Sequence, residues 1–278
     1  MTATTGTAGL NRVRADSRLM DALADLASAA GAVVMAHFGK CNAEIKGDGS
    51  PVTIADREAE ELILAGLARL VPGVPVISEE AASAGILADA GDDFILVDAL
   101  DGTKEFVACT DQFTVNIGLI HRGHPVGGVV FAPALSRLWL AGARAETCTL
   151  APGAGMAAAT GRHAITVRTP PQSGLVAVAS LRHMTPETEA YLTRLVVAER
   201  RAAGSSLKFC LLAEGQADIY PRFSPTMEWD TAAGDAVLRA AGGLVVTADG
   251  QPLTYGKRGE GYHNPDFIAT GARASLAR

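Results

Sequence analysis

The chain has 278 residues, of which 48% are hydrophobic and 19% charged, and its formal net charge at pH 7 is −6. This composition is ordinary for a globular protein, and the length predicts one large domain or two closely packed ones. The negative charge argues against a general nucleic-acid surface, because non-specific binding depends on neutralising phosphates with Lys and Arg.

No apolar run approaches about 18 residues, and the first residues, MTATTGTAGLNRVR, contain no apolar signal region. We therefore expect no integral membrane segment and a disordered segment over 1–16. The protein is expected in the cytoplasm, free or peripheral on the cytoplasmic face of the inner membrane. Its four cysteines show no Cys-x-x-Cys spacing, so reduced thiols are predicted.

Residues 17–38 place apolar side chains at three- and four-residue steps, which predicts an amphipathic helix. A second helix is predicted over 54–70, with Thr53 as its N-cap and Pro72-Gly73 beyond its end. Short apolar runs separated by Gly and Pro then predict strands, the last three following one another as in an antiparallel meander: VPVIS, DFILVD, FTVNIGLI, PVGGVVFAP and SRLWLAG.

The segment 151–161, APGAGMAAATG, is composed of small residues and is the expected boundary or exposed loop. We accordingly expect an N-terminal α+β part over 17–150 and a C-terminal α/β part over 162–272. Strands and helices alternate in the second part, which is typical of α/β structure: strand LVAVAS, helices over 186–199 and 205–214, strand ADIY, a helix over 230–241 and strand LVVT.

The run VDALDGTKEF places Asp98, Asp101 and Thr103 on a tight turn after an apolar strand, where Gly102 lets the backbone approach a ligand closely. The run EWDTAAGDAVLRAAGG places Asp230 at the head of a helix. At about 4 Å and an effective dielectric of about 20, each carboxylate pair repels by roughly 4 kcal/mol, which requires compensating protons or cations. Hard oxygen ligands suit Mg²⁺, so the motifs predict metal-assisted phosphoryl chemistry.

Each acidic residue also has an ordinary structural explanation. The aspartates of the turn are explained as Asx side chains that stabilise it. Thr53-x-x-Asp56 resembles a capping box at the start of a helix. Glu79 and Glu80 are explained as a solvated strand end, and Asp230 as a helix N-cap.

Taken together, the runs SPVTIAD, VISEE, VDALDGTKEF and WDTAAGDAVLRAAGG resemble the inositol monophosphatase superfamily of lithium-sensitive, Mg²⁺-dependent phosphatases. Within it, DGTKEF, DQFTVNIGLI, GSSLKFCLLAEGQADIYPRF and PTMEWDTAAG closely resemble the 3′(2′),5′-bisphosphate nucleotidases of the bacterial CysQ type. The resemblance runs from about residue 17 to residue 268. It implies the layered α/β/α/β/α sugar-phosphatase fold, with the active site between the two parts.

The resemblance also implies a site for about two or three Mg²⁺ ions, which would bring about five negative charges near neutrality before the substrate phosphate enters. Asp56 and Thr103 match positions that orient the attacking water, and with Glu79 they form the implied catalytic set. The implied metal ligands are Glu79, Asp98, the Leu100 carbonyl, Asp101 and Asp230, with Asp56 at the position of a further ion.

Substrate choice is expected to come from the second half of the chain. The run from Gly204 to Lys208 begins a helix that could hold a second phosphate, and Arg222 offers a bidentate fork. A Ser N-cap and a solvated charge are the simpler explanations. His183 matches a position that stacks on adenine, although an ordinary surface histidine fits equally well. The implied substrate-binding residues are Gly102, Thr103, His183, Ser205, Ser206, Lys208, Arg222 and Asp230.

The chain departs from the family pattern near His183, where Leu181 stands at a position that is often Arg, and at Ala99-Leu100, where Pro-Ile or Pro-Leu is usual. The implied activity is conversion of adenosine 3′,5′-bisphosphate to AMP and phosphate, with 3′-phosphoadenylyl sulfate as a second substrate, in sulfur metabolism. The partner is then a small nucleotide bisphosphate, bound by a monomer or homodimer. A phosphatase for inositol phosphate or fructose 1,6-bisphosphate, and an inactive nucleotide or metal sensor, remain alternatives.

Overall fold

The computed structural model of the protein describes residues 15–40, 43–47, 51–179 and 184–272. The expected disordered segment 1–16 lies outside this range apart from its last two residues, of which Asp16 caps the first helix by accepting the N–H of Leu19 at 2.9 Å. The helices of the described residues are α1 (Ser17–His37), α2 (Ile54–Leu70), α3 (Glu79–Ser83), α4 (Thr103–Val107), α5 (Pro186–Leu192), α6 (Leu207–Ala213) and α7 (Ala232–Ala240). The strands are β1 (Glu44–Ile45), β2 (Pro51–Val52), β3 (Val76–Ser78), β4 (Asp93–Asp101), β5 (Thr114–His121), β6 (His124–Ala132), β7 (Arg137–Ala141), β8 (Ala145–Thr149), β9 (Thr160–Ala164), β10 (Leu175–Ala179), β11 (Val197–Ala202), β12 (Ile219–Arg222), β13 (Leu244–Thr247) and β14 (Phe267–Thr270).

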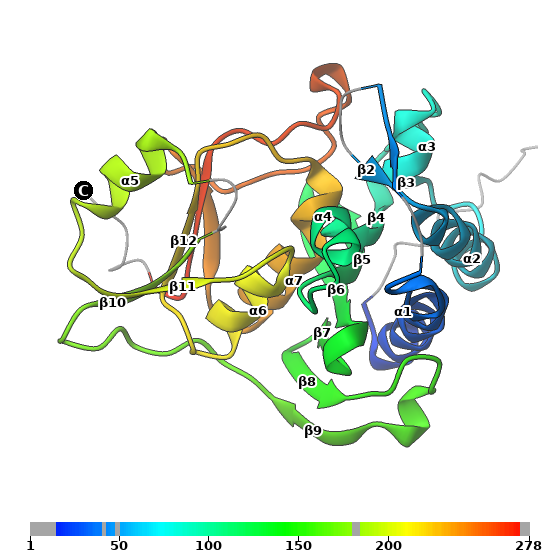
Figure 1. Ribbon diagram of the computed structural model, residues 1–278, viewed down its shortest axis with the longest axis horizontal. Coiled ribbons are helices and arrows are strands. Elements are labelled where there is room, and N and C mark those ends of the chain that lie inside the picture. The colour runs from blue at the N-terminus through cyan, green and yellow to red at the C-terminus, as the bar shows by residue number, and fades with distance from the viewer. Residues whose placement is uncertain (1–14, 41–42, 48–50, 180–183, 273–278) are drawn as a thin grey trace, which may run out of the picture.

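These elements form alternating layers of helices and sheets (Figure 1). The larger sheet has the strand order β3-β4-β5-β6-β7-β8-β9 and is antiparallel except for the pair β3 and β4. Helices α1 and α2 pack on one of its faces, while α6 and α7 lie between its other face and the smaller sheet, β11-β10-β12-β14-β13. Helix α5 covers the remaining face of the smaller sheet. The predicted α/β/α/β/α fold class is confirmed.

Strand β4 shows how the sequence sets the two faces of the larger sheet. Side chains alternate along a strand, and here Ile95 and Val97 pack under α1 and α2, whereas Phe94 and Leu96 pack on the side of α7. Burial of both faces explains why this strand is a continuous apolar run in the sequence. Asp98 continues the second series, so the alternation places its carboxylate on the face that meets the C-terminal half.

Two glycines on neighbouring strands let α7 approach the larger sheet closely. Gly118 of β5 and Gly128 of β6 are paired in register. A Cβ on Gly118 would lie 2.8 Å from the Cβ of Ala232, and a Cβ on Gly128 would lie 2.7 Å from the carbonyl oxygen of Ala233. Because α7 begins at Ala232, shortly after Asp230, this close contact helps to set the distance between Asp230 and the sheet.

Helix α1 is the one helix in the described part of the chain that is long and apolar enough, by length and composition, to cross a membrane. Its residues Leu23, Ala27, Ala30 and Val34 are fully buried, and the helix packs against α2 and β6. The core helix of a globular protein meets the same criterion, and the burial of this face accounts for its apolar sequence.

Both N-terminal helices, the Thr53 cap and the antiparallel meander are confirmed. The helix predicted over 186–199 is wrong beyond Leu192, because the chain from Val197 forms β11 and pairs in parallel with β10. Pairing between strands there outweighs the helix propensity of Ala, Glu and Arg. The helix predicted over 230–241 is a 3₁₀ turn, Glu228–Asp230, followed by α7, and its N-cap is Thr231 rather than Asp230.

The chain leaves the larger sheet later than the sequence predicted. The segment 151–161 is largely exposed, as expected of a loop, but β9 begins at its last two residues and pairs with β8. After Ala164 the chain crosses to β10 in the smaller sheet. Division into an N-terminal and a C-terminal part remains our proposal, and this pairing places the boundary after Ala164.

Candidate active site

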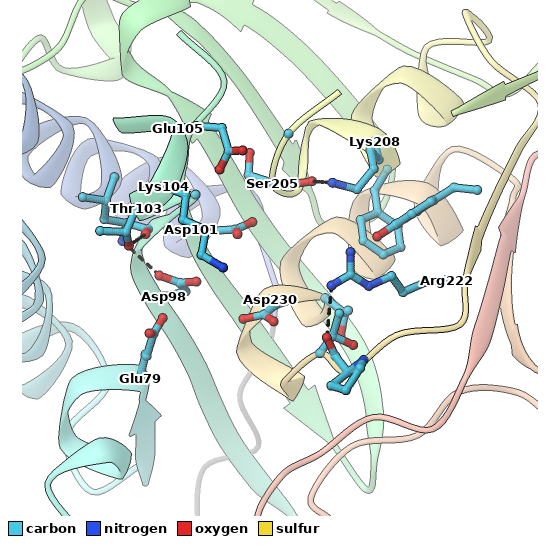
Figure 2. Close-up of a pocket in the computed structure, with 18 of the residues that line it drawn as sticks. Glu79, Asp98, Asp101, Thr103, Lys104, Glu105, Ser205, Lys208, Arg222 and Asp230 are labelled. Atoms are coloured by element: carbon cyan, nitrogen blue, oxygen red, sulfur yellow. Dashed lines mark hydrogen bonds between the residues drawn. The ribbon is translucent and has the colours of Figure 1, made fainter. Parts of the chain in front are cut away.

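A pocket of about 310 Å³ opens where the ends of several elements meet. Figure 2 shows its walls. The end of β4 and the start of α4 contribute residues between Asp98 and Glu105, the turn before α6 contributes Ser205, and the end of β12 and the turn before α7 contribute Arg222 and Asp230. Segments that are distant in the sequence therefore converge on one site.

Three carboxylates form the centre of this pocket. Glu79 begins α3, Asp98 lies on β4 and Asp230 ends the 3₁₀ turn, and one oxygen from each lies within 4.8 Å of the others. Asp101 lines the same pocket. The Asp98 carboxylate accepts the N–H of Leu100 at 3.0 Å, which stabilises the turn between the two aspartates.

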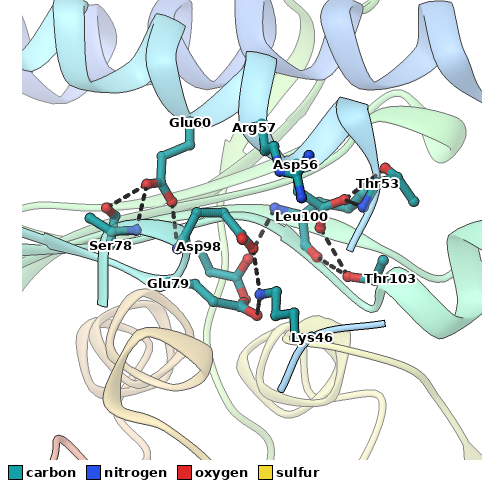
Figure 3. A network of polar contacts seen from close by, with 12 residues as sticks. Lys46, Thr53, Asp56, Arg57, Glu60, Ser78, Glu79, Asp98, Leu100 and Thr103 are labelled. Atoms are coloured by element: carbon teal, nitrogen blue, oxygen red, sulfur yellow. Dashed lines mark hydrogen bonds and ion pairs between the residues drawn. The ribbon is translucent and has the colours of Figure 1, made fainter. Parts of the chain in front are cut away.

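Glu60 of α2 fixes the start of α3 and thereby the position of Glu79 (Figure 3). Its buried carboxylate accepts the Ser78 hydroxyl at 2.8 Å and the N–H groups of Glu80 and Ala81 at 3.0 Å each. A carboxylate is favourable there because the first N–H groups of a helix lack acceptors within the helix. Sequence reasoning missed Glu60, since a glutamate in an amphipathic helix resembles an ordinary surface charge.

Lys46 reaches the carboxylates from the hairpin formed by β1 and β2 (Figure 3). Its ammonium lies 2.8 Å from an oxygen of Glu79 and 2.6 Å from an oxygen of Glu80. Burial lowers the pKa of Lys46, but the charges and hydrogen bonds of the two glutamates outweigh burial and raise it above its ordinary value. Lys46 offsets part of the negative charge. No motif marked it in the sequence, because its partners lie on a different element.

The pKa values of the central carboxylates reflect their crowding. Burial raises the pKa of Asp98 well above its ordinary value, and the charges of Glu79 and Asp101 raise it further. Burial and the charges of Asp101 and Glu79 act on the pKa of Asp230 in the same direction. Burial also raises the pKa of Glu79 to about 7, although the charge of Lys46 opposes this shift.

This carboxylate cluster fits a hard divalent cation such as Mg²⁺. Carboxylate and carbonyl oxygens are the ligands that this cation takes in proteins. The raised pKa values show that bringing these groups together costs free energy unless protons or cations compensate their charge, and a bound cation supplies that charge. Of the residues predicted to hold such ions, Glu79, Asp98 and Asp230 lie within 4.8 Å of one another, and Asp101 and Leu100 line the same pocket.

Asp56 and Thr103 form a hydrogen-bonded pair beside this cluster (Figure 3). The Thr103 hydroxyl donates to Asp56 Oδ1 at 3.0 Å or to the Leu100 carbonyl at 3.2 Å. The other oxygen of Asp56 accepts the N–H and the hydroxyl of Thr53, both at 2.7 Å, which completes the capping box. Because its two oxygens have different partners, Asp56 both caps α2 and holds Thr103. Thr103 lines the pocket, and Asp56 lies behind it.

The turn before α6 and the first turn of that helix bring further polar residues to the pocket. Ser205 and Lys208 line it, whereas Ser206 is buried behind the wall. Ser205 has a φ of 44°, in the left-handed region, and its carbonyl accepts the Lys208 ammonium at 2.5 Å. Burial lowers the pKa of Lys208 to about 8, while the charge of Asp101 opposes this shift.

Arg222 lines the pocket from the end of β12. Its guanidinium donates to the carbonyls of Ser224 and Pro225 at 3.2 Å and 3.0 Å, which fixes its orientation. A guanidinium has five N–H donors, more than these two contacts use, and its fork matches a phosphate. His183, predicted to stack on adenine, lies outside the described residues.

Residues 16–277 match the Inositol monophosphatase family over nearly the whole chain. The chain belongs to the inositol monophosphatase family. It is 42% identical over 257 residues to the 3′(2′),5′-bisphosphate nucleotidase CysQ of Escherichia coli K12, covering 90% of this chain and 98% of that protein. It is 45% identical over 230 residues to the Salmonella typhimurium protein of the same name, covering 81% and 87%. The crystal structure of CysQ from Bacteroides thetaiotaomicron, a bacterial member of the family, matches with a TM-score of 0.77 at 39% identity, covering 92% of this chain and 98% of that one. The resemblance inferred from the motifs is confirmed.

The carboxylate cluster should make the metal-free protein less stable as the pH rises. The pKa of Glu79 in the folded protein, about 7, exceeds its ordinary value of 4.5, so the folded state binds a proton more tightly than the unfolded chain. The stability that this proton contributes is complete below pH 4.5 and is lost as the pH rises through about 7. The raised pKa values of Asp98 and Asp230 act in the same direction.

We expect the Tm measured in EDTA to fall between about pH 5 and about pH 8, and saturating Mg²⁺ to reverse most of the fall. The Asp98→Asn variant should show a shallower fall and a higher metal-free Tm at the upper pH, with little response to Mg²⁺. A metal-free Tm that does not depend on pH in this range would contradict the assignment of the cluster.

Proposed function

We propose that this protein is a Mg²⁺-dependent phosphatase that removes the 3′-phosphate of adenosine 3′,5′-bisphosphate, giving AMP and phosphate. The observation that carries the proposal is a single pocket that holds a carboxylate cluster together with the cationic residues Lys208 and Arg222. The cluster suits cations that bind the reacting phosphate, and the cationic residues suit a second phosphate that is retained. Relatives named 3′(2′),5′-bisphosphate nucleotidase support the same substrate.

We also propose 3′-phosphoadenylyl sulfate as a second substrate. It carries the same 3′-phosphate and has an anionic group at the 5′ position, so the same two regions of the pocket can bind it. A place in sulfur metabolism follows from these substrates. Location in the cytoplasm, free or peripheral on the inner membrane, and a monomeric or homodimeric state remain predictions.

The start of α4 is suited to the phosphate that is cleaved. Gly102 and Thr103 line the pocket there, and the first N–H groups of a helix lack acceptors within the helix. Gly102 has a φ of 96°, and a Cβ at this position would lie 3.1 Å from the carbonyl oxygen of Gln112. Only glycine adopts this backbone without strain, which explains why a glycine stands between Asp101 and Thr103.

Thr103 and Asp56 orient the attacking water. When the Thr103 hydroxyl donates to Asp56 Oδ1, its oxygen is left to accept a hydrogen bond from a water in the pocket. Burial raises the pKa of Asp56, although hydrogen bonds from Thr53 and Thr103 oppose it, and a higher pKa makes Asp56 a better proton acceptor. Bound divalent cations would stabilise the negative charge on the phosphoryl oxygens and lower the pKa of the attacking water. No residue of the chain needs to form a covalent bond to phosphate.

A phosphate-release panel tests the proposed activity. Adenosine 3′,5′-bisphosphate should be hydrolysed with Mg²⁺ and not in EDTA, with kcat/KM at least about 10-fold above that for inositol 1-phosphate, which lacks a second phosphate and therefore one charged hydrogen bond. Fructose 1,6-bisphosphate carries two phosphates on a different scaffold and is the comparison for a sugar phosphatase. A preference for either sugar phosphate would favour a sugar phosphatase instead. Mg²⁺-dependent nucleotide binding without phosphate release would indicate a sensor.

Thr103→Ala should lower kcat by about 10²-fold or more with little change in KM, because the variant loses the group that orients the water while leaving substrate binding intact. Thr103→Ser keeps the hydroxyl and is the matched control, which should retain most of the activity. The measurement is steady-state kinetics at saturating Mg²⁺, with Tm recorded for each variant. Normal kcat in a folded Thr103→Ala protein would rule out this role.

Arg222→Met should reduce the preference for adenosine 3′,5′-bisphosphate over 3′-AMP. Loss of a charged hydrogen bond to the 5′-phosphate costs about 1.5–3 kcal/mol, or about 10- to 150-fold in kcat/KM, and this loss should be absent with 3′-AMP. Lys208→Ala should act in the same direction. The control is Arg200→Met on β11, which removes an exposed ion pair with Glu189 of α5. Equal losses with both substrates would show that Arg222 does not read the second phosphate.

A further inference from the structure

A buried asparagine on β5, Asn116, lies at the base of the candidate active site. It pairs in register with Asp98 of β4 and is fully buried. Its neighbours Val115 and Ile117 pack under α1 and α2, so the alternation of the strand directs Asn116 to the opposite face, where the carboxylates gather. Asn116 belongs to the run DQFTVNIGLI, which resembles the CysQ type, but no role was predicted for this residue because the run also fits an ordinary buried strand.

The Asn116 side chain connects the two halves of the site. Asn116 Nδ2 lies 3.3 Å from Asp101 Oδ2 and 3.0 Å from the Ser206 hydroxyl oxygen. An ionised carboxylate only accepts hydrogen bonds, which identifies the atom facing Asp101 as the amide nitrogen. The Ser206 hydroxyl in turn donates to the carbonyl of Asp230 at 2.8 Å. The contacts therefore run from Asp101 through Asn116 and Ser206 to Asp230.

These contacts join residues that lie on separate elements of the fold. Asp101 ends β4, and Asp230 ends the 3₁₀ turn before α7. Ser206 is the N-cap residue of α6, but its side chain makes no capping hydrogen bond to that helix. Its hydroxyl is committed instead to Asn116 and Asp230, which explains why Ser206, predicted to bind substrate, is buried behind the pocket wall.

We propose that Asn116 is a positioning residue for the metal site, which acts through Asp101 directly and through Ser206 on Asp230. Asn116 holds these two acidic residues at a fixed separation, so that cations can bind to carboxylates from both halves of the chain. It does not line the pocket and has no contact with substrate in this role. The inference rests on the metal site of the proposed function and does not depend on which phosphate ester is hydrolysed.

A second bridge from the same segment offers a matched control. Gln112 Oε1 accepts the N–H of Gly204 at 2.8 Å, and a Cβ on Gly204 would lie 2.6 Å from the Gln112 carbonyl oxygen. This bridge supports the turn that carries Ser205, on the side of the pocket proposed to bind the second phosphate. Loss of the Gln112 side chain should therefore affect substrate binding and leave the carboxylates in place.

The test measures binding of Mn²⁺ alone, by electron paramagnetic resonance titration of metal-free protein without substrate. Asn116→Ala and Asn116→Leu should bind Mn²⁺ about 10- to 100-fold more weakly than the wild type, the range typical when a residue that orients a metal ligand is lost. In kinetics, the Mg²⁺ concentration for half-maximal activity should rise similarly, with KM at saturating Mg²⁺ little changed. Gln112→Ala should show the reverse pattern, with unchanged Mn²⁺ binding and a raised KM.

Ser206→Ala should weaken Mn²⁺ binding in the same way, and combining it with Asn116→Ala should add little, because both residues belong to one chain of contacts. Asn116→Leu keeps the branched shape of the side chain without its polar atoms, and Ser206→Ala tests the same chain of contacts from its other end, so that folding failure of one variant does not decide the matter. Wild-type Mn²⁺ affinity in the folded variants would overturn the inference. Failure of the wild type to bind Mn²⁺ would instead contradict the metal site itself.

Discussion

The main physical constraint on this fold is the repulsion among carboxylates that it brings together between the larger and the smaller sheet. Oxygens of Glu79, Asp98 and Asp230 lie within 4.8 Å of one another. At an effective dielectric of about 20, each ionised pair at such a distance costs roughly 4 kcal/mol, which is large beside a net stability of about 5–15 kcal/mol. The rest of the fold must therefore supply enough apolar burial and backbone hydrogen bonding to hold these groups in place without metal, and a bound cation would stabilise the folded state further.

The scaffold meets this demand by fixing the backbone at each acidic residue through contacts with packed elements. Asp98 lies within the buried part of β4, and Glu79 is fixed because Glu60 anchors the start of α3. Asp230 is brought close because Gly118 and Gly128 let α7 lie directly on the sheet. In each case the backbone is constrained by contacts away from the pocket. The carboxylates consequently cannot separate to relieve their repulsion without disturbing the core.

The sequence predicted the parts of this arrangement that local patterns encode. Apolar periodicity located both N-terminal helices and the meander, and the family motifs located Asp98, Asp101 and Asp230 in the pocket. Strand β11 was missed because it is an exposed strand rich in helix-forming residues, whose pairing with β10 is decided by the tertiary structure. The supporting contacts of Glu60, Lys46 and Asn116 were missed for the same reason: each partner lies on another element, and the residues themselves carry no local signal.

The two sides of the pocket also explain how an acidic protein can handle an anionic substrate. The chain carries a net charge of −6, and the carboxylate cluster alone would repel a phosphate. Lys208 and Arg222 line the same pocket, but Lys208 is buried and its pKa is lowered to about 8 by that burial, against the charge of Asp101. With a pKa of about 8 Lys208 is still largely protonated near pH 7, but one buried positive charge does not outweigh several carboxylates. In the proposed function, bound cations would neutralise the cluster and so make the pocket attractive to a bisphosphate.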